Sequence, residues 1–201
     1  MQHKRHPHLL DRHRSALFVV DVQEAFRPAM PGFEEMVRGV KLLIEGANAL
    51  GIPVAYAEQY PKGLGHTVPE LLEVLGDAPS FEKTEFSAYT APAWPSLPAA
   101  VRDAHQFVVV GIEGHVCVRQ TALDMLAAGR EVHLPMDAIA SRGLTQWQIS
   151  LSALQVAGAR LGTAEQVLFD WLGHARADGF KEIQSLIKSH DAAAAAATPV
   201  A

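Results

Sequence analysis

Residues 107–117, which read FVVVGIEGHVC, contain the pattern that decides the fold. The first four of them are apolar and are typical of a buried parallel strand, and a glycine-containing turn follows. A helical pattern begins around Cys117, runs through Ala128 and is closed by Gly129. A strand that turns into a helix in this way is the repeating unit of α/β proteins, in which ligands bind at the carboxyl ends of the strands.

Strand-like and helical patterns alternate along the rest of the chain, which predicts βαβ units and a parallel sheet. The expected strands are 16–21, 54–57, 80–83, 107–110, 131–134 and 159–162, and the expected helices are 33–50, 68–75, 97–104, 117–128, 146–157, 163–172 and 180–188. This order predicts one α/β domain over residues 14–189, a three-layer α/β/α sandwich around a central, mainly parallel sheet of about six strands. Residues 1–13 and 190–201 are expected to be flexible termini.

The composition is that of an ordinary globular protein. The 201 residues are 49% hydrophobic and 19% charged, and a net charge of -5 gives no reason to expect nucleic acid or an anionic membrane as a partner. No apolar stretch approaches the roughly 20 residues of a membrane-spanning helix. The single cysteine cannot form an internal disulfide, so the expected location is the reducing cytoplasm.

The role of that cysteine, Cys117, has two interpretations. At a helix N-terminus after a central strand, exposed backbone N–H groups and the helix dipole favour the thiolate, which is the nucleophilic form. A lone cysteine is also commonly a small buried hydrophobe. Position alone leaves both readings open.

Two other polar residues stand at strand ends. Asp21 closes the first strand directly after a run of apolar residues, and Lys83 closes the expected strand 80–83. Because the carboxyl ends of parallel strands meet at one edge of the sheet, we expect Asp21, Lys83 and Cys117 to converge. Lys83 alone would be taken for a solvated charge, but beside a carboxylate and a thiol it becomes a buried cation.

Three segments carry a family resemblance: VVDVQEAF (residues 19–26), FEKTEFS (81–87) and VGIEGHVCV (110–118). Together they resemble the isochorismatase-like cysteine hydrolases, which include nicotinamidases and N-carbamoylsarcosine amidohydrolase and use an Asp–Lys–Cys triad. The resemblance covers about residues 14–172. The segments EQYPKGLG (58–65) and FKEIQSLIK (180–188) resemble a narrower branch, the isochorismatase domain-containing proteins, whose substrate is generally unassigned.

The resemblance implies hydrolysis of an amide or carbamoyl C–N bond through a thioester-type acyl-enzyme. Cys117 would be the nucleophile, Asp21 the base that takes the thiol proton and returns it to the departing amine, and Lys83 the cation that holds the carboxylate. The oxyanion hole would be formed by the backbone N–H groups of Glu113 and Cys117, next to a non-proline cis peptide between Ile112 and Glu113.

The walls of the substrate pocket are less well defined by the sequence. Candidate pocket residues, all in or beside the loops that carry the triad, are Gln23, Phe26, Gln59, Phe86, Tyr89 and His115. Gln23 and Gln59 are candidates for orienting a polar substrate group. Trp94 is assigned to packing, and Glu113 is expected to point toward a subunit interface.

Two departures from relatives narrow the reaction. Nicotinamidases have an Asp-x-His metal site after their second strand, whereas this chain has Glu58 and Gln59 there with only His66 nearby, so we expect no metal and no cofactor. Isochorismatases proper lack the cysteine, so vinyl-ether hydrolysis of isochorismate is a disfavoured alternative. Gly114 stands where many members have threonine, which is expected to loosen the turn.

Two further alternatives stay open. The fold and the triad residues also suit a binding or scaffolding protein without turnover, and a thiol redox sensor limited to mixed disulfides or sulfenic acid. The expected partners are a small-molecule substrate and further copies of the chain, in a dimer or larger homo-oligomer. The residues do not identify the substrate.

Overall fold

The computed structural model describes residues 5–197 and contains one six-stranded sheet in the order β3-β2-β1-β4-β5-β6. All neighbouring strands are parallel. The strands are β1 (Ser15–Val20), β2 (Val54–Gln59), β3 (Ser80–Lys83), β4 (Gln106–Gly111), β5 (Glu131–Pro135) and β6 (Arg160–Gly162). The predicted α/β sandwich with a parallel sheet of about six strands is confirmed.

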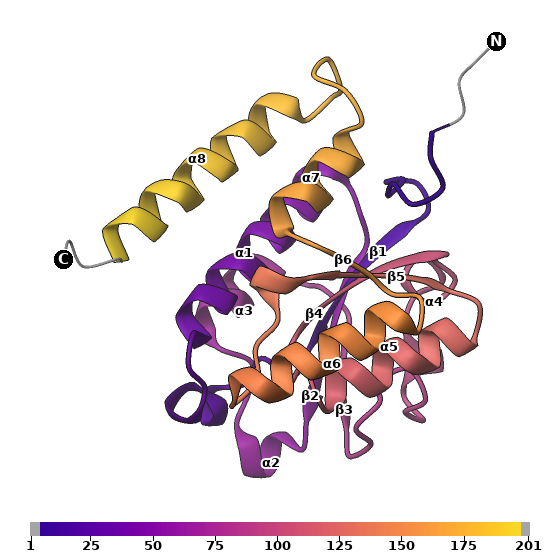
Figure 1. Cartoon of the computed structure of the whole chain (residues 1–201), viewed down its shortest axis with the longest axis vertical. Helices are drawn as coiled ribbons and strands as arrows, with labels where there is room; N and C mark the ends of the chain where they lie inside the picture. Colours follow the sequence, from indigo (N-terminus) through magenta and orange to yellow (C-terminus); the bar gives the residue numbers. More distant parts are fainter. Residues whose placement is uncertain (1–4, 198–201) are drawn as a thin grey trace.

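Helices cover both faces of the sheet (Figure 1). The α-helices are α1 (Phe33–Leu50), α2 (Pro61–Leu64), α3 (Pro69–Leu75), α4 (Ala99–Arg102), α5 (Cys117–Ala127), α6 (Leu144–Val156), α7 (Ala164–Leu172) and α8 (Phe180–Ala197); the 3-10 helices are η1 (Glu24–Ala29), η2 (Trp94–Ser96) and η3 (Met136–Ala138). One layer is formed by α1 with α3, α7 and α8, and the other by α5 and α6.

Alternating residues of each strand fill the two layers of the core. In β1, Leu17 and Val19 pack on the α1 side, while Phe18 and Val20 pack on the α5 side. The predicted packing role of Trp94 is confirmed, because its ring is buried and lies 5.0 Å from the ring of Phe18. Both faces of β1 and β4 are buried, which is why these strands read as continuous apolar runs.

The ends of the chain differ from the expectation of flexible segments at 1–13 and 190–201. Leu10 is fully buried, and its N–H donates to Asp170, so the chain packs on the domain before residue 14. Helix α8 continues to Ala197, because alanine is the residue that best sustains a helix once it has begun. Residues 1–4 and 198–201 of those segments lie outside the described residues. No helix among residues 5–197 is long and apolar enough to cross a membrane.

The strand order places a switch point between β1 and β4. From β1 the chain builds the sheet outward through β2 and β3, then returns to β4 and builds toward β6. Such a switch point leaves a crevice outside the carboxyl ends of the two central strands. Gly111 allows β4 to end very close to β1, since its φ is 108° and a Cβ there would lie 2.2 Å from the carbonyl oxygen of Val20.

Candidate active site

Asp21 is the first residue after β1 and lies at the switch point. Its φ of 54° is in the left-handed region, which aspartate tolerates better than most residues. Its N–H donates to the carbonyl of Ala57, and this bond fixes the turn to β2. The carboxyl group is buried: Oδ2 accepts a hydrogen bond from Lys83, and no nitrogen or oxygen donor among the described residues reaches Oδ1.

Lys83 ends β3, and its side chain is fully enclosed. Its ammonium nitrogen donates to Asp21 Oδ2 at 2.7 Å and to Gln59 Oε1 at 2.7 Å. Backbone carbonyls of the following loop complete the shell, with that of Glu85 at 3.1 Å. Further hydrogen bonds help to offset the cost of burying a charge, and the Lys83 ammonium has them. The 2.7 Å contact shows that Asp21 and Lys83 converge, as the sequence predicted.

Cys117 is the first residue of α5 and is 7% exposed. Burial and the neighbouring charge of Asp21 raise the pKa of its thiol to about 12, although the charge of Lys83 opposes this shift. Burial and Asp21 therefore oppose the contribution that the sequence predicted from the helix N-terminus, and the thiol stays protonated in the resting protein. The reason is that desolvation and a nearby carboxylate oppose a second negative charge at this position.

The carboxyl group of Asp21 has an intermediate acidity. Burial raises its pKa to about 6, while the charge and hydrogen bond of Lys83, and the thiol of Cys117, pull the pKa down. At neutral pH the carboxyl group of Asp21 is therefore mostly ionised, while the thiol of Cys117 is protonated. Such a carboxylate can accept the thiol proton at the moment when sulfur attacks an electrophile.

The loop between β4 and α5 exposes two backbone donors. The peptide bond between Ile112 and Glu113 is cis. The carbonyl of Glu113 accepts from the N–H groups of Val116 and Val118, whereas the N–H groups of Glu113 and Cys117 have no backbone acceptor among residues 5–197. Free N–H groups beside a nucleophile are the usual components of an oxyanion hole.

Helix α6 and the preceding loop hold this turn in place. Ser150 of α6 donates to the carbonyl of Gly114 at 2.8 Å, and Arg142 Nε donates to Glu113 Oε1 at 2.8 Å. The side chain of Glu113 is thus buried in an ion pair within the chain. A Cβ on Gly114 would lie 2.9 Å from a side-chain carbon of Ile139, so the turn packs closely against the loop that follows β5, and a larger residue would require a shift there.

Two predicted pocket residues instead build the scaffold around Lys83. Gln23 is fully buried, and its amide N–H groups donate to the carbonyls of Gln59 and Gly65, at 3.0 and 2.6 Å. The side chain of Gln59 is bound on one side to Lys83 and on the other to the carbonyl of Thr84. The proposed role of Gln23 in orienting substrate is therefore corrected, because it is buried and both of its N–H groups are engaged within the protein. Gln59 is partly exposed, and one acceptor among the described residues serves its two N–H groups, so its role stays a prediction.

The four other pocket candidates do not share one environment. Phe26 packs against the α1 layer of the core, whereas Tyr89 packs against the α5 layer, with its ring 4.9 Å from Trp94. Phe86 is 54% exposed. His115 keeps a buried Nδ1 that has no hydrogen-bond partner among the described residues.

The position of the metal site in nicotinamidases is occupied by an internal hydrogen-bond cluster. Glu58 accepts from the N–H and hydroxyl of Thr67, at 2.7 and 2.8 Å, and its other oxygen lies 3.0 Å from His66 Nδ1. Burial alone would raise the pKa of Glu58, but these bonds outweigh it and lower the pKa. No three His, Cys, Asp or Glu side chains in the described part of the chain are grouped to hold a metal ion.

These features define a parallel α/β protein with an acid, an ammonium and a thiol at the switch point of its sheet. The family model for the isochorismatase domain matches residues 15–166. The chain therefore belongs to the isochorismatase family, as its three motifs predicted.

The relatives agree with this assignment. Isochorismatase domain-containing protein 1 of Salmo salar is 40% identical over 175 residues, which are 87% of this chain and 61% of that protein, so the chain spans about three fifths of this relative. A structure described as MAR1 ribonuclease from Caenorhabditis elegans is 41% identical with a TM-score of 0.83, over 90% of this chain and 92% of that one. The YcaC gene product of Escherichia coli, described as an octameric hydrolase of unknown specificity, shares the fold, with a TM-score of 0.79 and 21% identity over 94% and 99% of the two chains.

Proposed function

We propose that this protein is a metal-independent cysteine hydrolase that cleaves an amide or carbamoyl C–N bond of a small molecule, with residues 14–189 as its hydrolase domain. The observation that carries the proposal is the environment of the Asp21 carboxylate. Its Oδ2 is held by Lys83 at 2.7 Å, and its Oδ1 has no hydrogen-bond partner among the described residues. The carboxylate lies close enough to Cys117 for its charge to raise the pKa of the thiol. This arrangement suits a base that takes a proton from sulfur.

In the first half of the reaction, Asp21 removes the thiol proton as Sγ of Cys117 attacks the substrate carbonyl carbon. The negative charge that develops on oxygen is stabilised by the N–H groups of Glu113 and Cys117. The intermediate collapses when the proton passes from Asp21 to the substrate nitrogen and the C–N bond breaks. The amine leaves, and a thioester on Cys117 remains.

In the second half, Asp21 removes a proton from water as its oxygen attacks the thioester carbonyl. The C–S bond breaks, the carboxylic acid is released, and the proton returns to sulfur. Throughout the cycle Lys83 stays charged and keeps the Asp21 carboxylate oriented, so it acts as a positioning residue.

A covalent adduct on Cys117 is the direct test of the proposal. We expect that a panel of small amides, carbamoyl compounds and ureides, quenched in acid during turnover, contains a substrate that adds its acyl mass to the protein. Since Cys117 is the only cysteine of the chain, peptide mapping assigns the adduct without ambiguity. Hydrolysis that continues after complete alkylation of Cys117 contradicts the proposal.

The pH dependence of kcat/KM provides a second test. Asp21 acts as the base only when ionised, and its raised pKa is about 6. Activity is expected to fall about tenfold per pH unit below that value as the carboxylate takes up a proton, and to be level from neutral pH upward. A thiolate formed in advance of substrate binding would give a different profile, which keeps rising between about pH 7 and 9 as the thiol ionises.

Cleavage of RNA is the second candidate function, because the 41% identical structure from Caenorhabditis elegans is described as a ribonuclease. The charge of this chain disfavours RNA cleavage, because RNA binding relies on unpaired basic residues and the net charge here is -5. The ammonium of Lys83 is also already paired with Asp21. Assays of the wild type and of Cys117→Ala on RNA and on the amide panel separate the two candidates.

Self-association is part of the same proposal, and helix α6 supports it. The helix, LTQWQISLSALQV, has no charged residue, and its Ile149 and Val156 are 65% and 91% exposed. A surface helix normally carries charge on its outer face, so a neutral outer face suits contact with another copy of the chain. The YcaC protein, which shares the fold, is described as an octamer, and this supports the proposal.

A further inference from the structure

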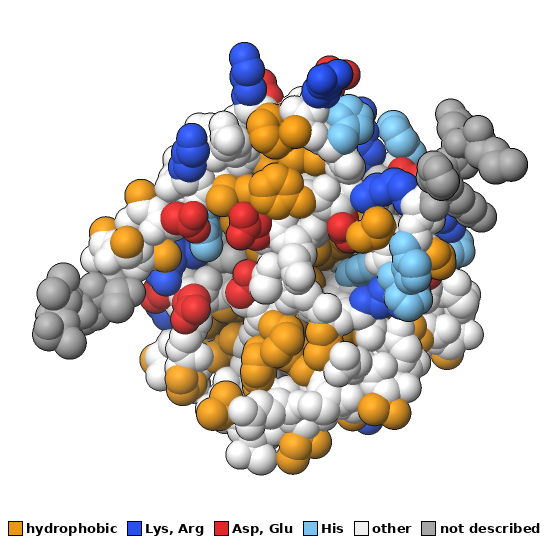
Figure 2. Space-filling model, turned by 45° about the horizontal axis from the view of Figure 1, so that its top comes forward, with side chains coloured by type: hydrophobic (Ala, Val, Ile, Leu, Met, Phe, Trp, Pro, Cys, Tyr) orange, Lys and Arg blue, Asp and Glu red, His pale blue; other side chains and the backbone are white. Residues whose placement is uncertain are grey.

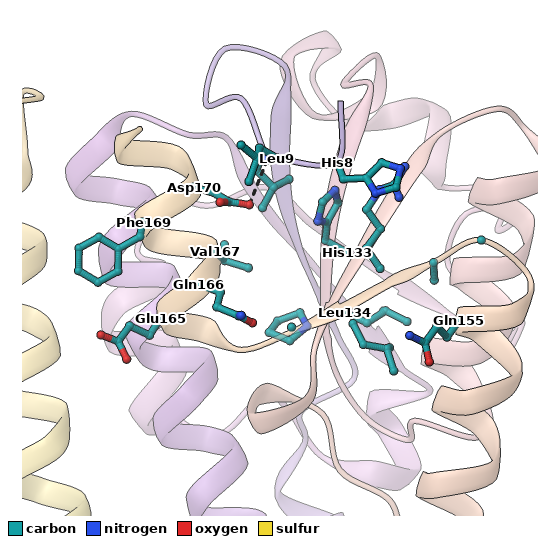
Figure 3. Close-up of a pocket in the computed structure, with 17 residues that line it drawn as sticks. His8, Leu9, His133, Leu134, Gln155, Glu165, Gln166, Val167, Phe169 and Asp170 are labelled. Atoms are coloured by element: carbon teal, nitrogen blue, oxygen red, sulfur yellow. Dashed lines mark hydrogen bonds between the residues drawn. The ribbon is translucent and has the colours of Figure 1, made fainter. Parts of the chain in front are cut away.

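A cavity of about 720 Å³ lies at the β6 edge of the sheet, between β5, β6, α7 and the segment His8–Leu10 (Figure 3). Strands β4 and β5 separate β6 from β1, so this cavity is distinct from the cluster of Asp21, Lys83 and Cys117. None of the site residues named above lines it. Figure 2 shows histidine side chains beside Lys and Arg side chains on this side of the molecule, near the N-terminal segment.

A buried histidine lacks a partner at this cavity. His133 of β5 lines it and is only 7% exposed, yet its Nε2 has no hydrogen-bond partner among the described residues. Figure 3 shows His133 next to His8 in the upper part of the cavity. Buried polar atoms are nearly always hydrogen-bonded, so an unpaired one that lines a cavity is a position where a ligand group can bind.

An unpaired guanidinium stands beside this histidine. Arg160 is the register partner of His133 across β5 and β6, and its Nε is buried without a partner in the described part of the chain. Burial, and next the charge of Arg160, lower the pKa of His133 to about 4, so the imidazole is neutral and can donate to an acceptor. Arg160 therefore carries the positive charge of this part of the cavity.

The nearby carboxylates leave Arg160 available. Glu131 accepts from Gln106 Nε2 at 2.9 Å, and Asp170 accepts from the N–H of Leu10 at 3.2 Å. The remaining one, Glu165, is exposed at the rim on α7. Each of the carboxylates of Glu131 and Asp170 already accepts a hydrogen bond from another group, whereas Arg160 Nε and His133 Nε2 have no partner among the described residues and stay available as donors to a ligand.

The remainder of the lining is apolar. Leu9 and Phe169 are 38% and 45% exposed, and they lie with Leu161 and Val167 around the same cavity. Exposed apolar side chains beside a small set of polar donors are typical of a site for an amphipathic small molecule.

We propose that this cavity binds a small organic carboxylate, with its carboxylate on Arg160 and His133 and its aliphatic body against Leu9 and Val167 (Figure 3). Arginine suits this role because its guanidinium matches a carboxylate with two parallel hydrogen bonds. The proposal is independent of the catalytic function, since it needs none of the residues at the switch point.

Calorimetric titration with hexanoate tests the proposal. We expect hexanoate to bind at least about tenfold more tightly than acetate, which lacks the body, and than hexan-1-ol, which lacks the charge. Arg160→Gln is expected to weaken hexanoate binding by about tenfold or more. Arg130→Gln, which removes the same charge outside the cavity, is expected to change it by less than about twofold, because distant charges are screened. Equal losses in the two variants, or no hexanoate binding to the wild type, would overturn the proposal.

A measurement on the wild type guards against variants that fold poorly. Nuclear magnetic resonance of the His133 ring is expected to show that hexanoate raises the pKa of His133, because a neighbouring anion favours the imidazolium. Cys117→Ala is expected to bind hexanoate as the wild type does. A His133 ring that does not respond, or loss of binding in Cys117→Ala, would place hexanoate elsewhere and refute the site, whether or not the protein proves to be an amidase.

Discussion

Turnover of any amide that the protein accepts is expected to fall by about 10⁴–10⁶-fold when Cys117 is replaced by alanine. The variant keeps Asp21 and Lys83 but has no atom that can form the thioester, so only binding and the backbone donors remain. The fold is expected to survive, because the change removes one buried sulfur that has no metal or disulfide to hold. Steady-state kinetics on the amide found in the screen, with circular dichroism as the folding check, measure the effect.

Asp21→Asn is the matched variant for this experiment. It retains the shape of the side chain but cannot take the thiol proton, and a thiol with a pKa of about 12 does not ionise unaided at neutral pH. We expect a loss of similar size, and no further loss in the double variant, since residues that act as a unit are not additive. Either single variant with turnover within tenfold of the wild type disproves the assigned roles.

Lys83→Met is expected to be the most destabilising change near the site. It leaves the Asp21 carboxylate buried without its cation, and breaking one half of a buried pair costs about 3–5 kcal/mol. Because the charge and hydrogen bond of Lys83 lower the pKa of Asp21, the variant's carboxyl group is expected to have a pKa above the wild-type value of about 6. An acid whose folded-state pKa is raised binds its proton more tightly in the native state. The loss of stability is therefore expected to be largest above the pKa of the variant's carboxyl group and to shrink as the pH falls toward the wild-type value of about 6. Below that pH both folded proteins carry a protonated Asp21, and the contribution of the unfolded state is the same for both.

Urea unfolding of four proteins checks this prediction: wild type, Lys83→Met, Asp21→Asn/Lys83→Met and the control Lys62→Met. Lys62 is exposed on α2, so its replacement should leave stability within about 0.5 kcal/mol of the wild type. The double variant is expected to recover most of the stability lost in Lys83→Met, because it removes the unpaired charge. A double variant as unstable as the single one would mean that packing around Lys83, and not its charge, is what matters.

The fold was predictable because its central strands are buried on both faces. Such strands appear in the sequence as short unbroken apolar runs, as in Phe107–Val110, and each is followed by turn residues. The convergence of Asp21 and Lys83 was predictable for a related reason: both stand at carboxyl ends of strands in one parallel sheet. The short helices η1 and α2 were missed, because their segments are too short for a helical period to be seen.

The electrostatic state of the site could not be read from the sequence. The acidity of Cys117 depends on how deeply the sulfur is buried and on how close Asp21 lies, and both come from packing between segments 96 positions apart in the chain. The hydrogen bonds of the Gln23 and Gln59 amides to backbone carbonyls could not be predicted either, because the sequence does not distinguish a glutamine bound within the protein from one that faces a substrate. The pairing of Glu113 with Arg142 is a contact between two loops that no local pattern marks.

The two outermost strands of the sheet are also its shortest, since β3 has four residues and β6 has three. An exposed strand edge invites another chain to add itself by backbone hydrogen bonds, and the number of bonds on offer grows with the length of the edge. Here each border presents very few free amides and carbonyls. Short borders of this kind disfavour the growth of fibrils by strand addition.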